Sequence, residues 1–592
     1  MFTRSKYKTV RPEETIQHVQ ALLEKAGIKT NLQKINTIGD EVTYRLTITN
    51  GDLWKFNIGT NGKGMTEQYA IASAYGEMME RLENKFLFRE NLLYATDHYL
   101  NQHIEMSWAQ QVRKKKLNLS FQYFPYEQEL TISRNRMENE IIPNFFPSYK
   151  DKIKLADESY TSIYAPYKDV YSNNTVLLPI EYIRAICGSN GLCAGNSREE
   201  ALIQGLNEIC ERYVLAHLFY EPHHMPRISL EEFKGHAAYE RLKLLEKDLK
   251  VILCDCSLGI GLPVIGLLLV DQNEGTFAFK LGADFNIVTA LERCYTEIFQ
   301  GKDARSQVFK HYRTSINDYA AQFYASFLTG TGDTPNHVLY DPKLPPKFPH
   351  HDFKTFEEEL DYFVQFFKDM GTHVYVADNS FLGFPAYSIY VPGFSELDLR
   401  LYDFEKMLRL KRYKYTHVKP LLHIPKAIEN QKIDEIIDLL GSVIDTRLQL
   451  QKWNIAPSAQ LLNQLLGTYV YAYLKDYNSA MKQLAGILDM FNGHSPIPTD
   501  LRCLYDVLSN IEKGEPMEAL ELLYSSSRVH TILQQLNDVA AYFGSLPMPR
   551  CFDCQECPIK DTCYIDQVIA FEKNLQQYQL AFMSQTEEQS MR

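Results

Sequence analysis

The sequence lacks several features that would assign it to common protein classes. It has no run of eighteen apolar residues, and no apolar segment follows the basic first residues, so we expect neither a membrane span nor a secretion signal. Positive charge is also scarce, because 62 lysines and arginines face 74 acids, which gives a formal net charge of −12. This balance argues against a nucleic-acid surface. The sequence therefore predicts a cytoplasmic protein that binds neither a membrane nor a nucleic acid.

The sequence also lacks the glycine spacing of a P-loop. Glycine-bearing turns do occur at residues 61–64 and 188–196, and each precedes a helical pattern rich in acids. Glycine lets backbone N–H groups approach an anion closely at the start of a helix. The pattern indicates an anion site of another type.

Three stretches with helical spacing place acids beside an arginine. Ser73, Glu77 and Glu80 are four and three residues apart, so they line one side of a helix, with Arg81 adjacent. A third stretch, farthest along the chain, contains Arg293 and Glu297, which are four residues apart. Between these two, a second stretch repeats the pattern of the first with Asn196, Glu200, Glu208, Glu211 and Arg212.

Carboxylates from three helices can share a cleft only if positive charge lies among them. Mg²⁺ suits this role, because it takes oxygen ligands and is usually held by a few carboxylates together with phosphate oxygens. Taken singly, each helix is explained as well by a solvated face with Glu–Arg pairs. The repetition favours a shared site, and the expected ligand is a magnesium nucleotide.

These motifs resemble those of the YcaO family. The resemblance is carried by residues 60–82, 189–214, 282–302 and 374–398, and it extends in consistent order through roughly residues 1–400. It implies ATP and Mg²⁺ as cofactors. The residues that it assigns to ATP and magnesium are Lys8, Ser73, Glu77, Glu80, Asn196, Glu200, Glu208, Glu211, Arg293 and Glu297.

Two further positions can be compared with the family pattern: one agrees with it, and the other departs from it. Thr15 matches a serine that approaches the nucleotide in the family, in the same short motif as Lys8. Cys193 stands where the resemblance leads us to expect a serine. A thiol is a poorer hydrogen-bond donor than a hydroxyl, which puts a role of Cys193 in nucleotide binding in doubt.

The resemblance implies an enzyme that phosphorylates the oxygen of a peptide amide after a nucleophile has added to the amide carbon. Loss of phosphate then leaves an azoline, a thioamide or an amidine. Azoline-forming relatives commonly end in a proline-rich tail, unlike residues 585–592 here, so we expect thioamide-type sulfur incorporation into a peptide or protein, with a sulfur-donor partner. No catalytic residue is assigned, because phosphoryl transfer mainly needs positioning and charge neutralisation.

Three alternative functions remain. The resemblance also implies an ATP-binding accessory factor for methylthiolation of a small-subunit ribosomal protein, with a methylthiotransferase partner. An azoline-forming cyclodehydratase is the second, and a non-catalytic, metal-binding interaction protein is the third. The retained acidic helices, with Arg293 and Glu297, argue against the third. A homodimer is a reasonable expectation for a chain of this size.

Four of the eleven cysteines are clustered near the C-terminus. They are Cys551, Cys554, Cys557 and Cys563. Four thiolates on a tight loop can wrap one metal centre, so we expect an iron–sulfur cluster or Zn²⁺, with iron–sulfur ahead. The other seven are scattered, mostly in apolar segments, where reduced cysteine behaves as a small core residue.

The order of patterns predicts an α+β fold, with a YcaO-type catalytic domain at residues 1–425. Strand-like runs at residues 175–178, 251–254, 263–270 and 373–377 alternate with helical patterns. Residues 110–175, which are aromatic and rich in proline, are expected to be largely irregular.

The C-terminal part is expected to be helical. Residues 426–545 form an all-α, tetratricopeptide-like region, in which Ala480 and Ala519 each follow a short polar turn. Such helices usually bind a partner, and a structural cap on the catalytic domain is the alternative. Residues 546–592 hold the cysteine cluster and a polar tail that we expect to be disordered after Met583.

Overall fold

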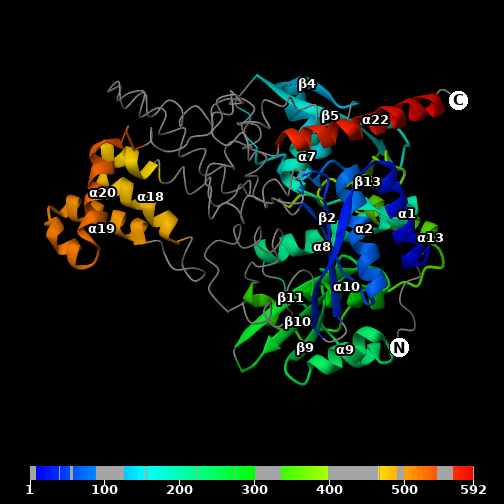
Figure 1. Ribbon diagram of the computed structural model, residues 1–592. Helices are drawn as coiled ribbons and strands as arrows, with labels where there is room; N and C mark the ends of the chain where they lie inside the picture. Colours follow the sequence, from blue (N-terminus) through cyan, green and yellow to red (C-terminus); the bar gives the residue numbers. More distant parts are fainter. Residues whose placement is uncertain are drawn as a thin grey trace. The chain divides into compact units, whose positions relative to one another are not determined.

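The computed structural model describes residues 9–87, 126–299, 335–397, 465–489, 499–542 and 565–590, with short gaps inside these ranges. The chain divides into two compact units. Unit 1 comprises Met1–Arg89, Ser120–Met407 and Gln567–Arg592, and unit 2 comprises Glu90–Leu119 and Leu408–Asp566. The described strands and the acidic helices belong to unit 1, which is therefore the α+β part of the chain (Figure 1).

Unit 1 begins with a helix and a small antiparallel sheet. α1 (Pro12–Lys25) is followed by β1 (Thr30–Ile38), β2 (Glu41–Ile48) and β3 (Gly59–Gly62), which pair in that order. α2 (Glu67–Glu83) packs on β2, β3 and α1. A Cβ on Gly62 would lie 1.9 Å from the carbonyl oxygen of Ala70, so glycine is required where β3 meets α2.

A six-stranded antiparallel sheet forms the second layer. Its order is β4–β5–β12–β13–β7, and β6 also pairs with β5. The strands are β4 (Gln128–Ser133), β5 (Ser159–Asp169), β6 (Thr175–Pro179), β7 (Leu192–Ala194), β12 (Tyr375–Asp378) and β13 (Ala386–Tyr390). The short helices between them are α5 (Arg134–Arg136), η3 (Met137–Ile141), α6 (Ile142–Phe145), η4 (Pro147–Tyr149) and α7 (Ile180–Cys187). The expectation that residues 110–175 are largely irregular was wrong for residues 128–149 and 159–169, which form strands and helices.

A third sheet, of four antiparallel strands, has the order β11–β10–β9–β8. Its strands are β8 (Arg227–Ile228), β9 (Lys250–Asp255), β10 (Val264–Asp271) and β11 (Thr276–Ala283). Helical segments packed around this part of the unit are η5 (Leu230–Phe233), α9 (Ala237–Leu245), α10 (Ile287–Phe299), η6 (Asn336–Leu339) and α13 (Phe356–Asp369). The predicted strands at residues 175–178, 251–254, 263–270 and 373–377 correspond to β6, β9, β10 and β12 and are confirmed.

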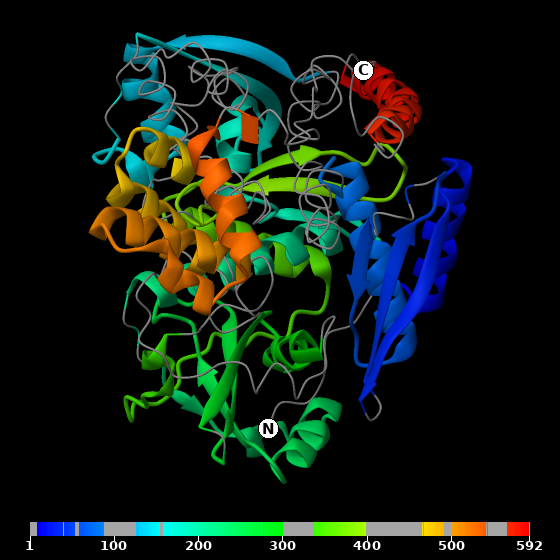
Figure 2. The same cartoon turned by 60° about the vertical axis from the view of Figure 1, so that its left-hand side comes forward.

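The long helix α8 (Arg198–Tyr220) connects the sheets. It packs on β7 and β13 of the six-stranded sheet, on β10 and β11 of the four-stranded sheet, and on α13. Figures 1 and 2 show α8 between these two sheets. Its apolar positions, among them Ile203, Leu206 and Val214, belong to one large core cluster. Because α8 is buried on most sides, the acids on its remaining face are held in a fixed position.

The described part of unit 2 is helical. It contains a helix at residues 467–473, then α18 (Tyr477–Asp489), α19 (Thr499–Lys513), η7 (Met517–Leu522) and α20 (Ser526–Asn537). Ala480 is buried in the core of this unit, but Ala519 is exposed and lies in a 3₁₀ helix. The structure therefore does not confirm a tetratricopeptide-like arrangement.

The last described segment of the chain is a helix. α22 (Ile565–Ser590) lies almost wholly in unit 1, and the Tyr578 hydroxyl donates to the carbonyl oxygen of Lys25 at 2.9 Å. The expectation of disorder after Met583 was wrong, because the helix continues to Ser590. The cysteine cluster at Cys551, Cys554, Cys557 and Cys563 lies outside the described residues.

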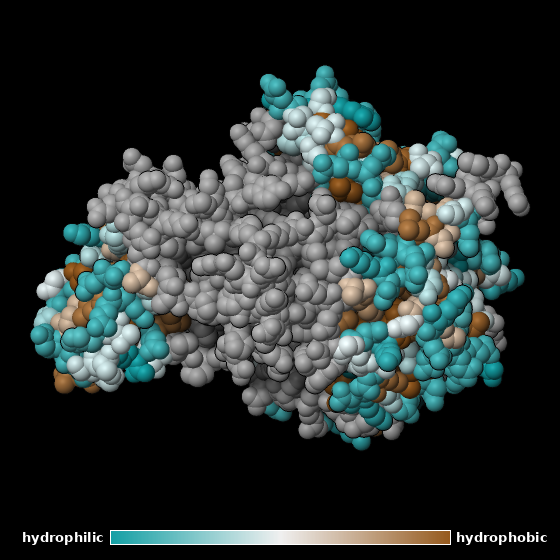
Figure 3. All heavy atoms as spheres, turned by 45° about the horizontal axis from the view of Figure 1, so that its top comes forward, coloured by the Kyte–Doolittle hydropathy of each residue, from teal (hydrophilic) through white to brown (hydrophobic). Residues whose placement is uncertain are grey.

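The surface of the described residues is mainly hydrophilic on the face shown in Figure 3, with hydrophobic side chains in small patches. Within the described ranges, no helix has the length and hydropathy needed to cross a bilayer.

Candidate functional site

The two main acidic helices begin with the same capping arrangement. The Thr66 side chain caps α2 by accepting from the backbone N–H of Tyr69, and the Ser197 side chain caps α8 by accepting from that of Glu200 at 3.1 Å. Each cap satisfies a backbone donor that has no partner within its helix. The acids of the predicted motifs therefore start from fixed first turns.

Lys63 interacts with acids from α2, α8 and α10. Its ammonium group forms an ion pair with Glu297 of α10. It also interacts electrostatically with Glu77 of α2 and with Glu208 and Glu211 of α8. The side chains of Lys63 and Glu297 are 25 % and 23 % exposed, so the pair is largely shielded from solvent. The structure thus brings together carboxylates from all three predicted helices, and we call them the carboxylate cluster: Glu77, Glu80, Glu208, Glu211 and Glu297.

Two arginines pair with acids of their own helix. Arg81 lies 3.6 Å from both Glu77 Oε1 and Glu80 Oε1, and Arg212 lies 3.7 Å from Glu208 Oε1 and Glu211 Oε1. Contacts between charged groups at more than 3.5 Å are ion pairs rather than well-formed hydrogen bonds. These four contacts therefore neutralise part of the glutamate charge without short hydrogen bonds.

Burial changes the acid–base behaviour of this cluster. Burial raises the pKa of Glu208, while Arg212, Arg81 and Lys63 oppose the rise. Burial also lowers the pKa of Lys63 to about 8, against the influence of Glu211, Glu77 and Glu208. Both shifts have the sign expected for charged groups that lose water.

A second group of polar side chains lies at the start of α8. Asn196 donates to Glu200 at 3.3 Å and accepts from the hydroxyl of Thr15 at 2.8 Å. The Thr9 hydroxyl donates to Glu200 Oε2 at 2.5 Å. Glu200 and Glu208 are separated by about 12 Å along the helix axis. A ligand that reaches both groups must therefore be extended, as a nucleoside triphosphate is.

The remaining predicted residues are placed around these two groups. Ser73 lies one helical turn before Glu77 on α2. Arg293 lies one turn before Glu297 on α10, and its guanidinium is 3.4 Å from the carboxylate of Asp284, which is 1 % exposed. Lys8 lies outside the described residues.

Cys193 lies beside the carboxylate cluster and is fully buried. Burial, together with Glu80 and Glu208, raises the pKa of its thiol well above the usual range. The thiol therefore stays protonated, and it donates to the carbonyl oxygen of Tyr387 at 3.5 Å. A protonated, buried thiol is not a nucleophile.

The structure adds residues that the sequence motifs did not single out. Arg45 of β2 acts on Glu77 and donates to Asn61 at 3.1 Å. Asn207 of α8 lies on the same stripe as Glu200 and Glu211, is fully buried, and makes no hydrogen bond through its side chain. Helical spacing could have pointed to Asn207, since it lies four residues before Glu211. No local signal could have pointed to Arg45, because its role depends on how β2 packs on α2.

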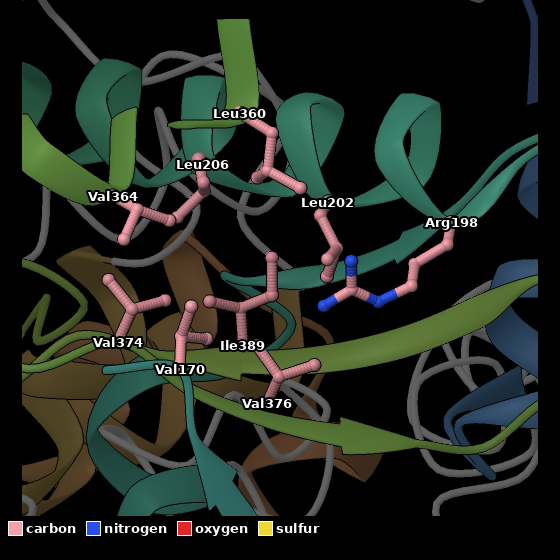
Figure 4. Close-up of a pocket in the computed structure, with 9 residues that line it drawn as sticks. All are labelled: Val170, Arg198, Leu202, Leu206, Leu360, Val364, Val374, Val376 and Ile389. Carbon is pink, nitrogen blue, oxygen red and sulfur yellow. The ribbon is translucent and has the colours of Figure 1, made fainter. Parts of the chain in front are cut away.

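A small pocket lies on a different face of α8 (Figure 4). The guanidinium of Arg198 points into it from the start of the helix. Eight aliphatic side chains form the rest of its lining: Val170, Leu202, Leu206, Leu360, Val364, Val374, Val376 and Ile389. Residues 198, 202 and 206 lie roughly opposite the acidic stripe of the helix. This lining offers no carboxylate for a metal, so the pocket is separate from the candidate site.

The donors of the carboxylate cluster fit Mg²⁺ by their chemistry, since all are carboxylate oxygens. Among the described residues, no three His, Cys, Asp or Glu side chains are already arranged to hold a metal ion. Magnesium in nucleotide sites commonly needs only one or two carboxylates, with phosphate oxygens and water completing its shell. The arrangement therefore fits a metal that arrives with a nucleotide better than a metal bound by protein alone.

The candidate site falls within a match to a known family. The model of the YcaO family, described as a cyclodehydratase that binds ATP and Mg²⁺, matches residues 61–395. This is more than half of the chain, and it includes α2, α8 and α10.

Two curated proteins match the same chain. It is 30% identical over 353 residues to an uncharacterised protein of Haemophilus influenzae. It is 29% identical over 357 residues to the ribosomal protein S12 methylthiotransferase accessory factor YcaO of Escherichia coli K12. Each alignment covers 57% of this chain and 57% of the relative, so the chain spans little more than half the length of these relatives.

A solved structure is also similar. It is YcaO from Methanopyrus kandleri bound with AMPPCP and Mg²⁺, with a TM-score of 0.43 and 17% sequence identity. The superposition covers 68% of this chain and 94% of that one.

Proposed function

Because the chain belongs to the YcaO family, we propose that it binds ATP with Mg²⁺ at the carboxylate cluster and uses the ATP to activate a backbone amide of a peptide or protein. The observation that carries this proposal is the meeting of acids from α2, α8 and α10 around Lys63. Concentrated negative charge of this kind is stable only with cations among the acids.

In this proposal, the two polar groups along α8 hold different parts of the nucleotide complex. The carboxylate cluster binds magnesium, and Ser73, Asn196, Glu200 and Lys8 bind the nucleotide. Bound Mg²⁺ would neutralise phosphate charge and make the terminal phosphoryl group a better electrophile. Arg293 is one turn from Glu297, and the guanidinium donors that do not face Asp284 would bind a phosphate.

The chemistry needs no covalent intermediate on the protein. A nucleophile adds to the amide carbon, and the resulting oxygen attacks the terminal phosphorus of ATP, which releases ADP. Elimination of phosphate from carbon then gives the modified amide. The protein positions the amide oxygen and neutralises charge, which accounts for most catalysis in phosphoryl transfer. The buried, protonated thiols of Cys193, Cys210 and Cys294 agree with a mechanism that has no cysteine nucleophile.

We further propose that the nucleophile is a sulfur species, so that the product is a thioamide. A sulfide equivalent from a donor protein would add to the amide carbon, and phosphate would carry away the former amide oxygen. In a cyclodehydratase, by contrast, the nucleophile is a side chain of the substrate peptide, and the product is an azoline. Product mass separates the two.

A second candidate function is supported by the relative from E. coli. That protein is named as an accessory factor for methylthiolation of ribosomal protein S12, and it is 29% identical to this chain over the aligned region. In such a role, the chain would bind ATP at the same site and act together with a methylthiotransferase.

We also propose that Cys551, Cys554, Cys557 and Cys563 bind an iron–sulfur cluster or Zn²⁺. The proposal rests on their close spacing. Anaerobic purification with metal and sulfide analysis should give bound metal that is lost when Cys551, Cys554 and Cys557 are changed to serine. Equal metal content in wild type and variant would contradict it.

The proposed function is tested by ATP turnover of the full chain with Glu77→Gln. We expect magnesium-dependent turnover to fall by at least about tenfold, because a metal-binding carboxylate is lost. Glu67→Gln is a matched control on the same helix, since Glu67 lies on another face and pairs with Lys34 at 3.7 Å. Unchanged turnover in Glu77→Gln, or an equal loss in both variants, would contradict the assignment.

A further inference from the structure

Lys63 differs from the other cations of the carboxylate cluster in the way it is held. Arg81 and Arg212 each lie within ion-pair distance of two acids of their own helix. Lys63 comes from the turn after β3 and pairs with Glu297 on α10, which is more than 230 residues away in sequence. Its ion pair therefore joins separate elements, whereas the four ion pairs given above for the arginines lie within one helix, although Arg81 also acts on Glu208 of α8.

The backbone around Lys63 is built to hold it close to α2. A Cβ on Gly62 would meet the Ala70 carbonyl oxygen at 1.9 Å, and a Cβ on Gly64 would meet the Ala70 amide nitrogen at 2.6 Å. Both contacts are with the helix backbone, which cannot move aside as a side chain can. The two glycines therefore let the turn lie directly on the first part of α2.

The charges around Lys63 make it a counter-ion of the cluster. Four carboxylates attract its ammonium group, those of Glu297, Glu211, Glu77 and Glu208, and the neighbouring Arg212 opposes them. Opposite charges a few ångströms apart in a partly shielded site interact strongly. The lysine therefore neutralises, in part, the same oxygens to which a divalent cation would bind.

A lysine is suited to leave such a position. Its charge is compact and lies at the end of a flexible four-carbon chain, and it binds phosphate as a point charge. A divalent cation has twice its charge and prefers carboxylate oxygens. When a magnesium nucleotide enters, the metal competes with Lys63 for Glu297, and the phosphates offer the ammonium group a new partner.

We propose that Lys63 is an exchangeable counter-ion of the nucleotide site, which pairs with Glu297 before binding and moves to a phosphate group when a divalent cation occupies the carboxylates. This inference rests on the proposed function, because it requires nucleotide and metal to bind at this cluster. It assigns a positioning role to Lys63, which lies in the glycine-bearing turn at residues 61–64.

The experiment uses calorimetry to measure two affinities of the full chain. The first is the affinity for Mg²⁺ without nucleotide, and the second is the affinity for ATP with EDTA present to remove divalent cations. In Lys63→Met, the affinity for Mg²⁺ alone should rise by about tenfold, because a competing positive charge is gone. The affinity for ATP without metal should fall by about tenfold, because a phosphate-binding cation is gone. A purely structural role of Lys63 would weaken both affinities together.

Lys34→Met is the matched control. Lys34 also pairs with a glutamate, Glu67 at 3.7 Å, but outside the cluster, so both affinities should stay within about twofold of wild type. Affinities for Mg²⁺ and ATP that fall together in Lys63→Met, or that do not change, overturn the inference.

A second variant covers the case in which Lys63→Met does not fold. Glu297→Gln leaves the lysine in place and removes its partner, so ATP in EDTA should bind at least about threefold more tightly. Unchanged or weaker binding overturns the inference. Wild-type protein that binds no ATP with magnesium present contradicts the proposed function itself, whereas wild-type binding with the wrong response of these variants contradicts only the exchange.

Discussion

Single buried residues next to the site differ in whether their polar groups are satisfied. Asn207 of α8 is fully buried, and its side-chain amide makes no hydrogen bond. Asn190 is similarly buried, and its Oδ1 also lacks a partner, but its amide N–H donates to the carbonyl oxygen of Ser395 at 2.8 Å. A buried polar group without a partner costs about 1–3 kcal/mol, whereas a satisfied one stabilises the fold.

We therefore predict opposite effects of the same substitution at these two asparagines. In ligand-free protein, Asn207→Leu should leave the melting temperature unchanged or raise it, because an unsatisfied amide is removed. Asn190→Leu should destabilise by about 1–3 kcal/mol, because it leaves a buried carbonyl without its donor. Thermal unfolding followed by circular dichroism checks both. A clear loss of stability in Asn207→Leu would contradict the structure at this position.

Glu396 gives unit 1 a pH dependence that does not involve the nucleotide site. The carboxyl is 1 % exposed, and it accepts from the Tyr390 hydroxyl at 2.8 Å and from the Gly393 N–H at 3.0 Å. Burial raises the pKa of Glu396 to about 7, from its usual value of 4.5. Between these two values, the folded protein binds more protons than the unfolded chain, so stability falls as pH rises.

We predict that Glu396→Gln removes this part of the pH dependence. Glutamine keeps an oxygen that can accept both hydrogen bonds, and it does not titrate. At pH 8 the variant should be more stable than wild type by at most about 3 kcal/mol, and at pH 4.5 or below the two should be alike. Melting temperatures measured from pH 4 to pH 8 check this. Parallel curves for the two proteins would contradict it.

At the scale of elements, the contact between β3 and α2 determines where Lys63 lies. Gly62→Ala would place a Cβ against the helix backbone, so strand and helix must separate. We predict a loss of stability of about 1–3 kcal/mol and weaker binding of magnesium nucleotide. Calorimetric titration and thermal unfolding measure the two effects.

Gly76→Ala is the control within the same helix. An added Cβ there meets nothing within 4 Å, and alanine favours the interior of a helix by about 0.5–1 kcal/mol over glycine. This variant should be at least as stable as wild type and should bind nucleotide normally. Equal loss of binding in both glycine variants would show that the position of β3 on α2 is not the cause.

The acidic helices could be predicted from the sequence because their signal is local. Ser73, Glu77 and Glu80 follow a helical spacing, and α2 contains all three. The strands β6, β9, β10 and β12 are short runs of apolar or branched residues, and they were predicted within two residues at each end.

The strand β5 could not be predicted in this way. Most of its residues are buried or half-buried, so they do not alternate between polar and apolar, and the strand contains Pro166. It is stabilised by partners far along the chain, since Asp169 pairs with Tyr375 of β12. The convergence of the three acidic helices was a hypothesis from repetition, whereas the ion pair of Lys63 with Glu297 depends on packing that no local pattern contains.

At the scale of the whole molecule, the candidate site belongs to unit 1, and so does the family match apart from residues 90–119. The match ends at residue 395, and the carboxylate cluster lies within it. Unit 2 has its own hydrophobic core, formed in part by Val470, Leu484 and Val507. A role of unit 2 in binding a partner stays a prediction.

The most direct test of the central claim is a calorimetric titration of the full chain with a non-hydrolysable ATP analogue, with and without Mg²⁺. We predict one binding site per chain, tighter binding with Mg²⁺, and affinity at least about tenfold weaker in Glu208→Gln, whose carboxylate interacts electrostatically with Arg212, Arg81 and Lys63. Glu240→Gln, on α9, should bind as wild type does. Absence of binding to the wild-type chain, or equal affinity in wild type and Glu208→Gln, would contradict a magnesium nucleotide site at the carboxylate cluster.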